Sequence, residues 1–115
     1  MTDSCLFCRI VAGEIPSTKV REDDLVLAIR DIAPQAPTHV LLMPRRHVRS
    51  LDDLGDAHAA LLGRIFALSA EIARAEGVEA DGYRVVANHG RAAGQSVDHL
   101  HFHVLGGRDL AWPPG

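Results

Sequence analysis

Residues 94–107 read GQSVDHLHFHVLGG, with histidine at every second position of the central part. These histidines are His99, His101 and His103. Successive side chains of a β-strand point to opposite faces, so an extended segment over residues 99–106 places the imidazoles on one face and apolar side chains on the other. The apolar side chains anchor such a strand in the core, and the anchored strand holds the imidazoles in register.

The alternating histidines have three interpretations. Imidazole acts near neutral pH as a nucleophile, as a general acid or base, or as a metal ligand. Neighbouring imidazoles disfavour joint protonation because like charges repel, and this leaves an unprotonated nitrogen for nucleophilic attack. A metal site is the second interpretation, for which Asp98 is the nearby carboxylate. The third is a half-exposed strand with histidine at its polar positions by chance, which such regular alternation disfavours.

Length and composition narrow the class of protein. The chain has 115 residues, and we expect one domain over residues 1–115. Hydrophobic residues make up 47% of the chain, enough for a packed core. A net charge of −3 with scattered basic residues does not indicate a nucleic-acid or membrane partner. Because no export signal or long apolar run is found and only two cysteines are present, we expect a cytoplasmic location.

Hydrophobic periodicity predicts few helices and many strands. We expect a short helix within residues 6–16 and a long helix over residues 51–77. The expected strands are two within residues 19–31, joined by a turn at 22–24, and three more at residues 38–44, 82–90 and 99–106. Too few helices are present for a βαβ series. The predicted fold is therefore α+β, with a mostly antiparallel sheet of about five strands.

The long helix has an unusually wide apolar surface. Asp53 or Asp56 can cap its start, and Gly77 suits its end. Two apolar stripes run along it, Leu61, Ile65, Leu68 and Ile72 in one and Leu62, Phe66 and Ala73 in the other. One stripe is enough to cover a sheet, so the second indicates burial against a partner subunit. The alternative is a helix sunk more deeply into its own core.

The N-terminal segment CLFC places Cys5 and Cys8 on one face of a helical turn. Two such thiolates bind zinc if two more ligands are supplied. The alternatives are a pair of small buried side chains and a redox motif. No strand precedes the pair, as it would in a thioredoxin-type unit, which argues against the redox motif.

Several segments together resemble one known family. The pattern HLHFHV is similar to the motif of the histidine triad (HIT) superfamily, and the other segments resemble its Hint branch of nucleotide-binding phosphoramidases. These segments are EIPSTKVREDD, RDIAPQAPTHVLLMPRRH, GYRVVANHG, GQSV and LGGRDLAWPPG, in the family order. The resemblance covers nearly the whole chain. It implies a HIT-like fold whose sheet continues across a homodimer.

The resemblance also implies an activity, the hydrolysis of the phosphorus–nitrogen bond in purine nucleoside phosphoramidates. The middle histidine, His101, would attack phosphorus and form a nucleotidyl-histidine that water then hydrolyses. His103 would donate to a phosphoryl oxygen, and His39 would support His101 or handle its proton. Ser96 would lie near the scissile bond. Which group protonates the leaving amine stays open.

The same resemblance implies a nucleotide site. Asp31 would bind the ribose, because a carboxylate accepts two hydrogen bonds from a vicinal diol. The loop that contains Gly94, Gln95 and Ser96 suits phosphate, and Asn88 would contact phosphate or ribose. Trp112, in the tail, would approach the active site of the partner. The purine slot would consist of Phe7, Ile10, Ile32 and Leu41. Taken singly, each of these residues also fits an ordinary turn or core position.

Some relatives carry a structural zinc ion, and the resemblance extends to its ligands. The matching residues are Cys5, Cys8, His47 and His99, so zinc is the expected metal. The chain departs from the family at Asp98, where relatives usually have an aromatic or apolar residue, and at Arg30. Two other functions remain open: dinucleoside polyphosphate hydrolysis or nucleotidyl transfer within the superfamily, and non-catalytic, regulatory nucleotide binding.

Overall fold

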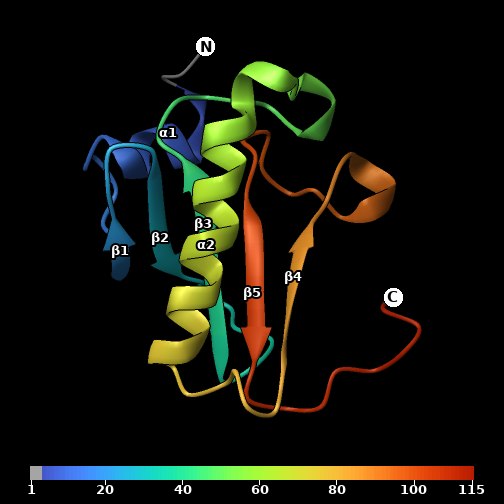
Figure 1. The fold of residues 1–115 in the computed structure, drawn as a ribbon. Coiled ribbons are helices and arrows are strands. Elements are labelled where there is room, and N and C mark those ends of the chain that lie inside the picture. Colours follow the sequence, from blue (N-terminus) through green and yellow to red (C-terminus); the bar gives the residue numbers. More distant parts are fainter. Residues whose placement is uncertain (1–3) are drawn as a thin grey trace.

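The computed structural model describes residues 4–115, which form a five-stranded antiparallel sheet with a helix on each face (Figure 1). The strands lie side by side in the order β1-β2-β3-β5-β4. The elements in chain order are α1 (Leu6–Val11), β1 (Lys19–Glu22), β2 (Val26–Arg30), β3 (Thr38–Pro44), α2 (Ala59–Ala75), β4 (Tyr83–Ala87) and β5 (Phe102–Gly106). The α+β class, the five strands and the long and short helices agree with the sequence prediction.

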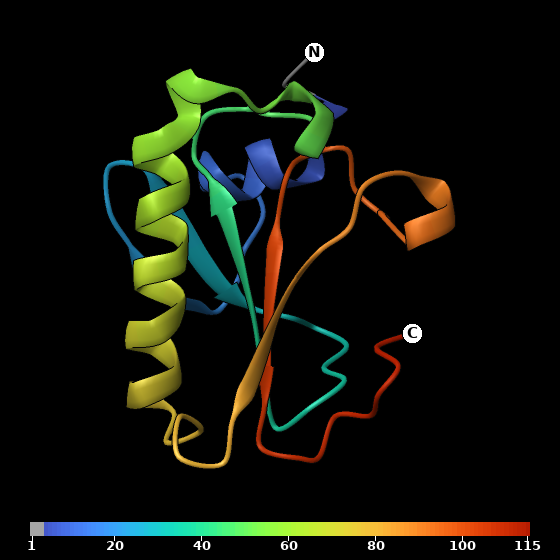
Figure 2. The same cartoon turned by 45° about the vertical axis from the view of Figure 1, so that its right-hand side comes forward.

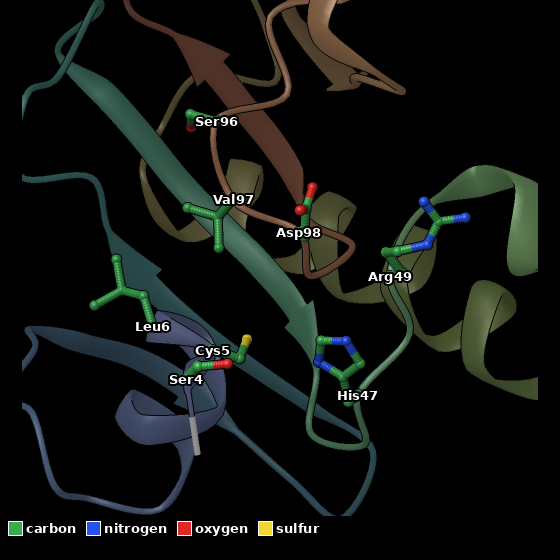
Figure 3. Close-up of a pocket in the computed structure, with 8 residues that line it drawn as sticks. All are labelled: Ser4, Cys5, Leu6, His47, Arg49, Ser96, Val97 and Asp98. Atoms are coloured by element: carbon green, nitrogen blue, oxygen red, sulfur yellow. The ribbon is translucent and has the colours of Figure 1, made fainter. Parts of the chain in front are cut away.

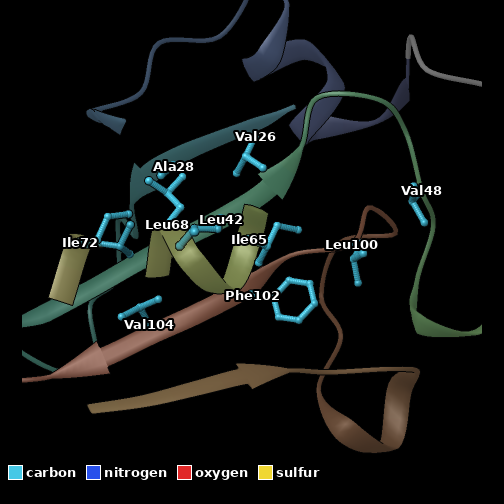
Figure 4. Packing of buried hydrophobic residues seen from close by; sticks show 11 residues of the cluster. Val26, Ala28, Leu42, Val48, Ile65, Leu68, Ile72, Leu100, Phe102 and Val104 are labelled. Carbon is cyan, nitrogen blue, oxygen red and sulfur yellow. The ribbon is translucent and has the colours of Figure 1, made fainter. Parts of the chain in front are cut away.

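The central strands are buried on both faces. All seven residues of β3 are buried, with Val40 and Leu42 in the cluster beneath α2 and Leu41 and Met43 in the cluster beneath α1. Figure 4 shows the α2 side, where Ile65 and other helix residues pack onto the sheet. Figure 2 shows α2 along one side of the sheet and α1 on the other. Strands covered twice are continuously apolar, which explains the sequence THVLLMP.

The histidine strand begins later than predicted. Its ladder starts at Phe102, opposite Leu42 of β3, whereas the pattern indicated a strand from residue 99. The amide of Leu100 donates instead to the carbonyl of Val48, at 2.7 Å, in the chain that follows β3. The alternation persists, since Leu100 and Phe102 pack beneath α2 while His99 and His101 contact Phe7 of α1.

The long helix is shorter than predicted. It starts at Ala59 and is preceded by two 3₁₀ turns, Leu51–Asp53 and Asp56–His58. Neither Asp53 nor Asp56 caps it, because the residue before the helix is His58 and the extended Gly55 (φ −152°, ψ −172°) separates the two turns. Gly77 follows the last turn with φ +75°, as expected for a helix C-terminus. Within residues 4–115 no helix combines the length and apolarity needed to cross a bilayer.

Candidate active site

A cleft of about 200 Å³ lies between α1, the ends of β2 and β5, and the segment before β5. Its walls combine apolar side chains with the carboxylate of Asp31, the hydroxyl of Ser96 and two imidazoles. The lining residues are Leu6, Phe7, Ile10, Ile29, Arg30, Asp31, Ile32, Leu41, Ser96, Val97, His101 and His103. All four residues predicted for the purine slot are among them, together with Ile29, Leu6 and Val97, which the sequence analysis did not assign.

The ring of His101 is held in one tautomer by the backbone. Its Nδ1–H donates to the carbonyl of His99 at 2.8 Å, because a carbonyl oxygen only accepts. In the neutral ring the proton is therefore on Nδ1, and Nε2 has a free lone pair. The edge of Phe7 packs against this ring, with centroids 5.0 Å apart, and His101 is only 6% exposed. A buried, oriented imidazole with an unprotonated nitrogen is a competent nucleophile.

His39 pairs with His103, where the sequence analysis expected it to support His101. The amide of Gln35 donates to Nδ1 of His39 at 3.0 Å, so the proton of the neutral ring is on Nε2. That Nε2–H donates to Nδ1 of His103 at 2.8 Å. His103 must then carry its own proton on Nε2. A single backbone amide thus sets two tautomers, and it leaves a neutral N–H donor on His103 at the cleft.

Asp31, His39 and His103 lie close enough to resemble a metal triad. One carboxylate oxygen of Asp31 accepts from the amide of Ala33 at 2.8 Å, and the other lies 3.4 Å from Nε2 of His39. The hydrogen bond from Gln35 excludes metal coordination through His39, because Nδ1 is already an acceptor and Nε2 is protonated. The triad therefore works as a hydrogen-bonded chain of polar groups.

The chain of imidazoles is neutral at physiological pH. Burial, reinforced by the nearby His101 and His39, lowers the pKa of His103 to about 4, although Asp31 acts in the opposite direction. Burial also lowers the pKa of His39, again opposed by Asp31. Two neutral rings can keep the hydrogen-bond direction just described, whereas protonation of His103 at Nδ1 would break it.

The loop before the histidines is fastened by Gln95. Its side-chain oxygen accepts from the amide of Gly90 at 2.9 Å and from the hydroxyl of Ser50 at 2.8 Å. Its NH₂ group donates to the carbonyls of Arg49 at 3.0 Å and Val97 at 3.1 Å. All the hydrogen-bonding positions of this amide are thereby used. The side chain of Gln95 therefore holds this loop in place, and its contact with a nucleotide stays a prediction.

Ser50 and His89 extend the hydrogen-bond network of Gln95. Because the oxygen of Gln95 must accept, the single proton of Ser50 is directed to it, and Nδ1–H of His89 donates to Ser50 at 2.7 Å. Ser50 is therefore no nucleophile, although it contacts a histidine. Neither residue was predicted, since one serine and one histidine 39 positions apart give no motif. Only the folded chain brings them together.

The other predicted site residues lie outside the cleft lining. Gly94 has the left-handed conformation (φ +91°) that favours glycine, in the loop that leads to Ser96. Asn88 directly follows β4, whose ladder with β5 ends at the pair Ala87–Phe102. Trp112 is 84% exposed in the C-terminal tail, which runs beyond the β4 edge in Figure 1.

Four side chains from three parts of the fold converge at the N-terminus of α1. The Sγ of Cys5 lies 3.3 Å from Nδ1 of His99, and the Sγ of Cys8 lies 3.3 Å from Nδ1 of His47 and 3.5 Å from that of His99. Ligands of a tetrahedral zinc ion stand roughly 3.3–3.8 Å apart, given bond lengths of about 2.0–2.3 Å. The donor set and its spacing therefore fit this metal.

The surroundings of the Cys/His cluster also suit a metal. Nε2–H of His99 donates to the carbonyl of Pro44 at 2.8 Å, which leaves Nδ1 unprotonated and directed at both cysteines. Without a cation, burial and the neighbouring Cys5 raise the pKa of the Cys8 thiol to about 11. A divalent cation reverses this balance and stabilises the thiolate. The group can hold a metal ion, which would join α1 to the segment after β3 and the segment before β5.

A second hollow, of about 510 Å³, opens beside this cluster (Figure 3). It is lined by Ser4, Cys5, Leu6, His47, Arg49, Ser96, Val97 and Asp98. Leu6, Ser96 and Val97 line both this hollow and the cleft that contains His101. The two cavities are therefore neighbours that share one wall.

Comparisons with known proteins agree with this geometry. The chain matches the HIT domain family over residues 12–110. It is 46% identical over 110 residues to the purine nucleoside phosphoramidase of Escherichia coli strain K12, which covers 96% of this chain and 92% of that protein. It is 48% identical over 112 residues to the 14 kDa zinc-binding protein of Zea mays, with coverages of 96% and 87%.

The fold is also very similar to those of solved structures of this family. A crystal structure of a HIT family hydrolase from Legionella pneumophila Philadelphia 1 superposes with a TM-score of 0.96 at 49% identity, covering 97% of this chain and 100% of that chain. The fold and the row of imidazoles thus define a protein of the histidine triad class. The chain belongs to the HIT family and is similar to its Hint-like members, as the sequence motifs indicated.

The neutral state of His103 gives a pH prediction. Its pKa of about 4 lies below its ordinary value of 6.5, so between these pH values the unfolded chain binds more protons than the folded one. The free energy of unfolding should therefore fall as the pH drops from 6.5 towards 4. Denaturant titrations at several pH values measure this slope, which His103→Gln should reduce. An equal slope in that variant would contradict the assignment.

Proposed function

We propose that this protein hydrolyses nucleoside 5′-phosphoramidates, in which a purine nucleoside monophosphate is joined to an amine. The observation that carries the proposal is the tautomer of His101, whose Nδ1 is bound to a carbonyl and whose Nε2 is the free nitrogen at the cleft. The 46% identity to a purine nucleoside phosphoramidase supports the substrate class.

The cleft has suitable groups for the nucleotide half of the substrate. The purine would lie among the apolar side chains of Phe7, Ile10, Ile32 and Leu41. Ile32 is fully exposed in the free protein, so covering it with a base removes apolar surface from water. The carboxylate of Asp31 would accept hydrogen bonds from the ribose diol while it keeps its bond to the amide of Ala33.

The reaction proceeds in two displacements at phosphorus. Nε2 of His101 attacks, the phosphorus–nitrogen bond breaks, and the amine departs after gaining a proton. A water molecule then attacks the nucleotidyl-histidine, the bond to Nε2 breaks, and the nucleoside monophosphate leaves. The sum consumes one water molecule and releases one amine and one nucleotide.

Charge on the phosphoryl oxygens is met by neutral donors. Nε2–H of His103 would donate to one of them, and the hydrogen bond that Nδ1 of His103 accepts from Nε2–H of His39 would keep this proton on Nε2. The hydroxyl of Ser96, which lines the cleft, would contact the phosphate or the leaving nitrogen. Asn88 and the backbone at Gly94 would add further polar contacts.

Replacement of the nucleophile tests this proposal. His101→Ala should fold and bind adenosine monophosphate but lose hydrolysis of an adenosine phosphoramidate by several orders of magnitude. Mass spectrometry of rapidly quenched wild-type protein should find an adenylyl adduct on His101. Normal turnover by the variant would refute the mechanism. Turnover only of a diadenosine polyphosphate, or binding without turnover, would indicate the other histidine triad functions.

We infer that Cys5, Cys8, His47 and His99 hold a structural zinc ion. The zinc-binding relative from Zea mays and the spacing of the four ligand atoms support this. The ion would fasten α1, which forms one wall of the cleft, to the segment that contains the histidines. Its role is to stabilise the fold, because the four protein ligands leave no open coordination position.

Metal analysis tests the zinc centre. Protein purified without chelator should contain about one zinc ion per chain, and a chelator should lower its unfolding temperature because structural zinc binding contributes to folding free energy. The double variant Cys5→Ala, Cys8→Ala should lose both the metal and the chelator effect. Wild-type protein free of zinc, or a variant of unchanged stability, would refute the centre.

We also propose that two copies form a homodimer through β4 and the exposed side of α2. β4 is an edge strand with a free side, and Phe66 of α2 is 52% exposed although its ring contacts Phe102. The C-terminal tail is tied to β4 by the hydrogen bond from the guanidinium of Arg84 to the carbonyl of Ala111, so the exposed Trp112 would then reach the site of the partner. Such an arrangement would extend the sheet and cover Phe66, the exposed member of the second apolar stripe, whereas Ala73 and Leu62 pack in the core of the chain itself.

Sedimentation tests the assembly. At micromolar concentration the protein should sediment with twice the chain mass of 12.4 kDa. Phe66→Ser should weaken association, because it removes an aromatic ring from the proposed contact, whereas Arg74→Ala on the same helix should not. A wild-type monomer at this concentration would refute the dimer.

A further inference from the structure

The cleft that contains His101 and the hollow beside the Cys/His cluster both have Ser96 in their walls. We expect the phosphorus atom of the substrate to lie near this residue. The cleft of about 200 Å³ contains Asp31 and the apolar slot, which fit a nucleoside. The hollow of about 510 Å³ lies on the other side of Leu6 and Val97. Figure 3 shows Ser96 and Asp98 above the start of α1, with His47 to the right of Cys5 and Arg49 to the right of Asp98.

A phosphoramidate also has two halves, joined at phosphorus. If the nucleoside occupies the cleft and phosphorus lies beside His101 and Ser96, the amine must extend from Ser96 in another direction. The hollow is the larger cavity and has Ser96 in its wall, so it is the neighbouring space into which the amine can extend. Its shape and charge would then select among amines.

The charges that line the hollow leave one carboxylate unmatched. Arg49 is already paired with Asp53, with Nε to Oδ2 at 3.5 Å. His47 directs its Nδ1 at the thiol of Cys8. Asp98 is exposed, and no hydrogen bond or ion pair to its side chain occurs among residues 4–115. A cation entering the hollow therefore meets a free negative charge.

We propose that the hollow is the leaving-group subsite and that Asp98 makes it selective for amines with a second, positively charged group. This inference rests on the proposed phosphoramidase function and names the amine half of its substrate. The class comprises diamines and other amines that have an ammonium group a few bonds from the nitrogen on phosphorus. Asp98 is a specificity residue here, because it contacts the substrate away from the reacting atoms.

Two substrates of equal shape isolate the effect of charge. Adenosine phosphoramidates of 1,3-diaminopropane and of butylamine differ only in an ammonium group in place of a methyl group. The measured quantity is the ratio of their kcat/KM values. Asp98→Asn should lower this ratio about two- to five-fold, the range of an exposed ion pair. The comparison between proteins cancels the different basicity of the two amines.

Three controls make the result specific. Asp81→Asn, an exposed carboxylate that lines other surface pockets, should leave the ratio unchanged. Added salt should narrow the ratio of the wild-type protein, since exposed charges are screened. Asp98→Lys should favour the phosphoramidate of a carboxylate-bearing amine such as 4-aminobutyrate over that of butylamine.

The outcomes separate this inference from the function on which it rests. The unsubstituted adenosine phosphoramidate, which has no tail in the hollow, tests the phosphoramidase function in the wild-type protein. Its hydrolysis, together with a diamine ratio that Asp98→Asn leaves unchanged, would overturn the subsite and leave the phosphoramidase intact. Absence of hydrolysis of every phosphoramidate by the wild-type protein would overturn both.

Discussion

The hydrogen bond from Nδ1 of His101 to the carbonyl of His99 is the constraint on which the site depends. It decides which nitrogen of the central imidazole has a free lone pair, and so whether this ring can attack phosphorus at all. The same residue, His99, points its own ring at Cys5 and Cys8 and is fixed from behind by the carbonyl of Pro44. One residue thus joins the candidate metal centre to the candidate nucleophile through its side chain and its backbone.

A single backbone amide, that of Gln35, also sets the direction of the hydrogen bonds between His39 and His103. The N–H of Gln35 donates to His39, and the resulting direction of hydrogen bonds runs through His39 to His103. Three histidines that look equivalent in the sequence therefore differ in chemistry. His99 presents Nδ1 to the thiols, His101 has a free Nε2, and His103 has a proton on Nε2. Burial keeps the last ring neutral, which preserves this order.

The sequence predicted much of the fold because its signals are local. Alternation at residues 99–104 and the apolar run THVLLMP are consequences of burial on one or two faces of a strand. The predictions that were wrong depend on distant groups. Residues 99–101 leave the ladder because Leu100 bonds to Val48, and the long helix starts eight residues late because Gly55 is extended. The hydrogen bonds that connect Gln95 to Ser50 and Ser50 to His89 were also not predicted, because these residues come from separate parts of the chain.

By itself the sequence determined the α+β class, the family, and the residue types that are available for chemistry, since spacing and composition record which faces are buried. Tertiary structure alone decided the partners. It brought His39 to His103 rather than to His101. It also fixed the distances from Cys8 to His47 and His99, which the family resemblance had already implied as fellow ligands. It also opened the hollow beside Ser96. The physical reason is that tautomers, metal geometry and cavities depend on distances of a few ångströms between segments far apart in the chain, which residue order does not record.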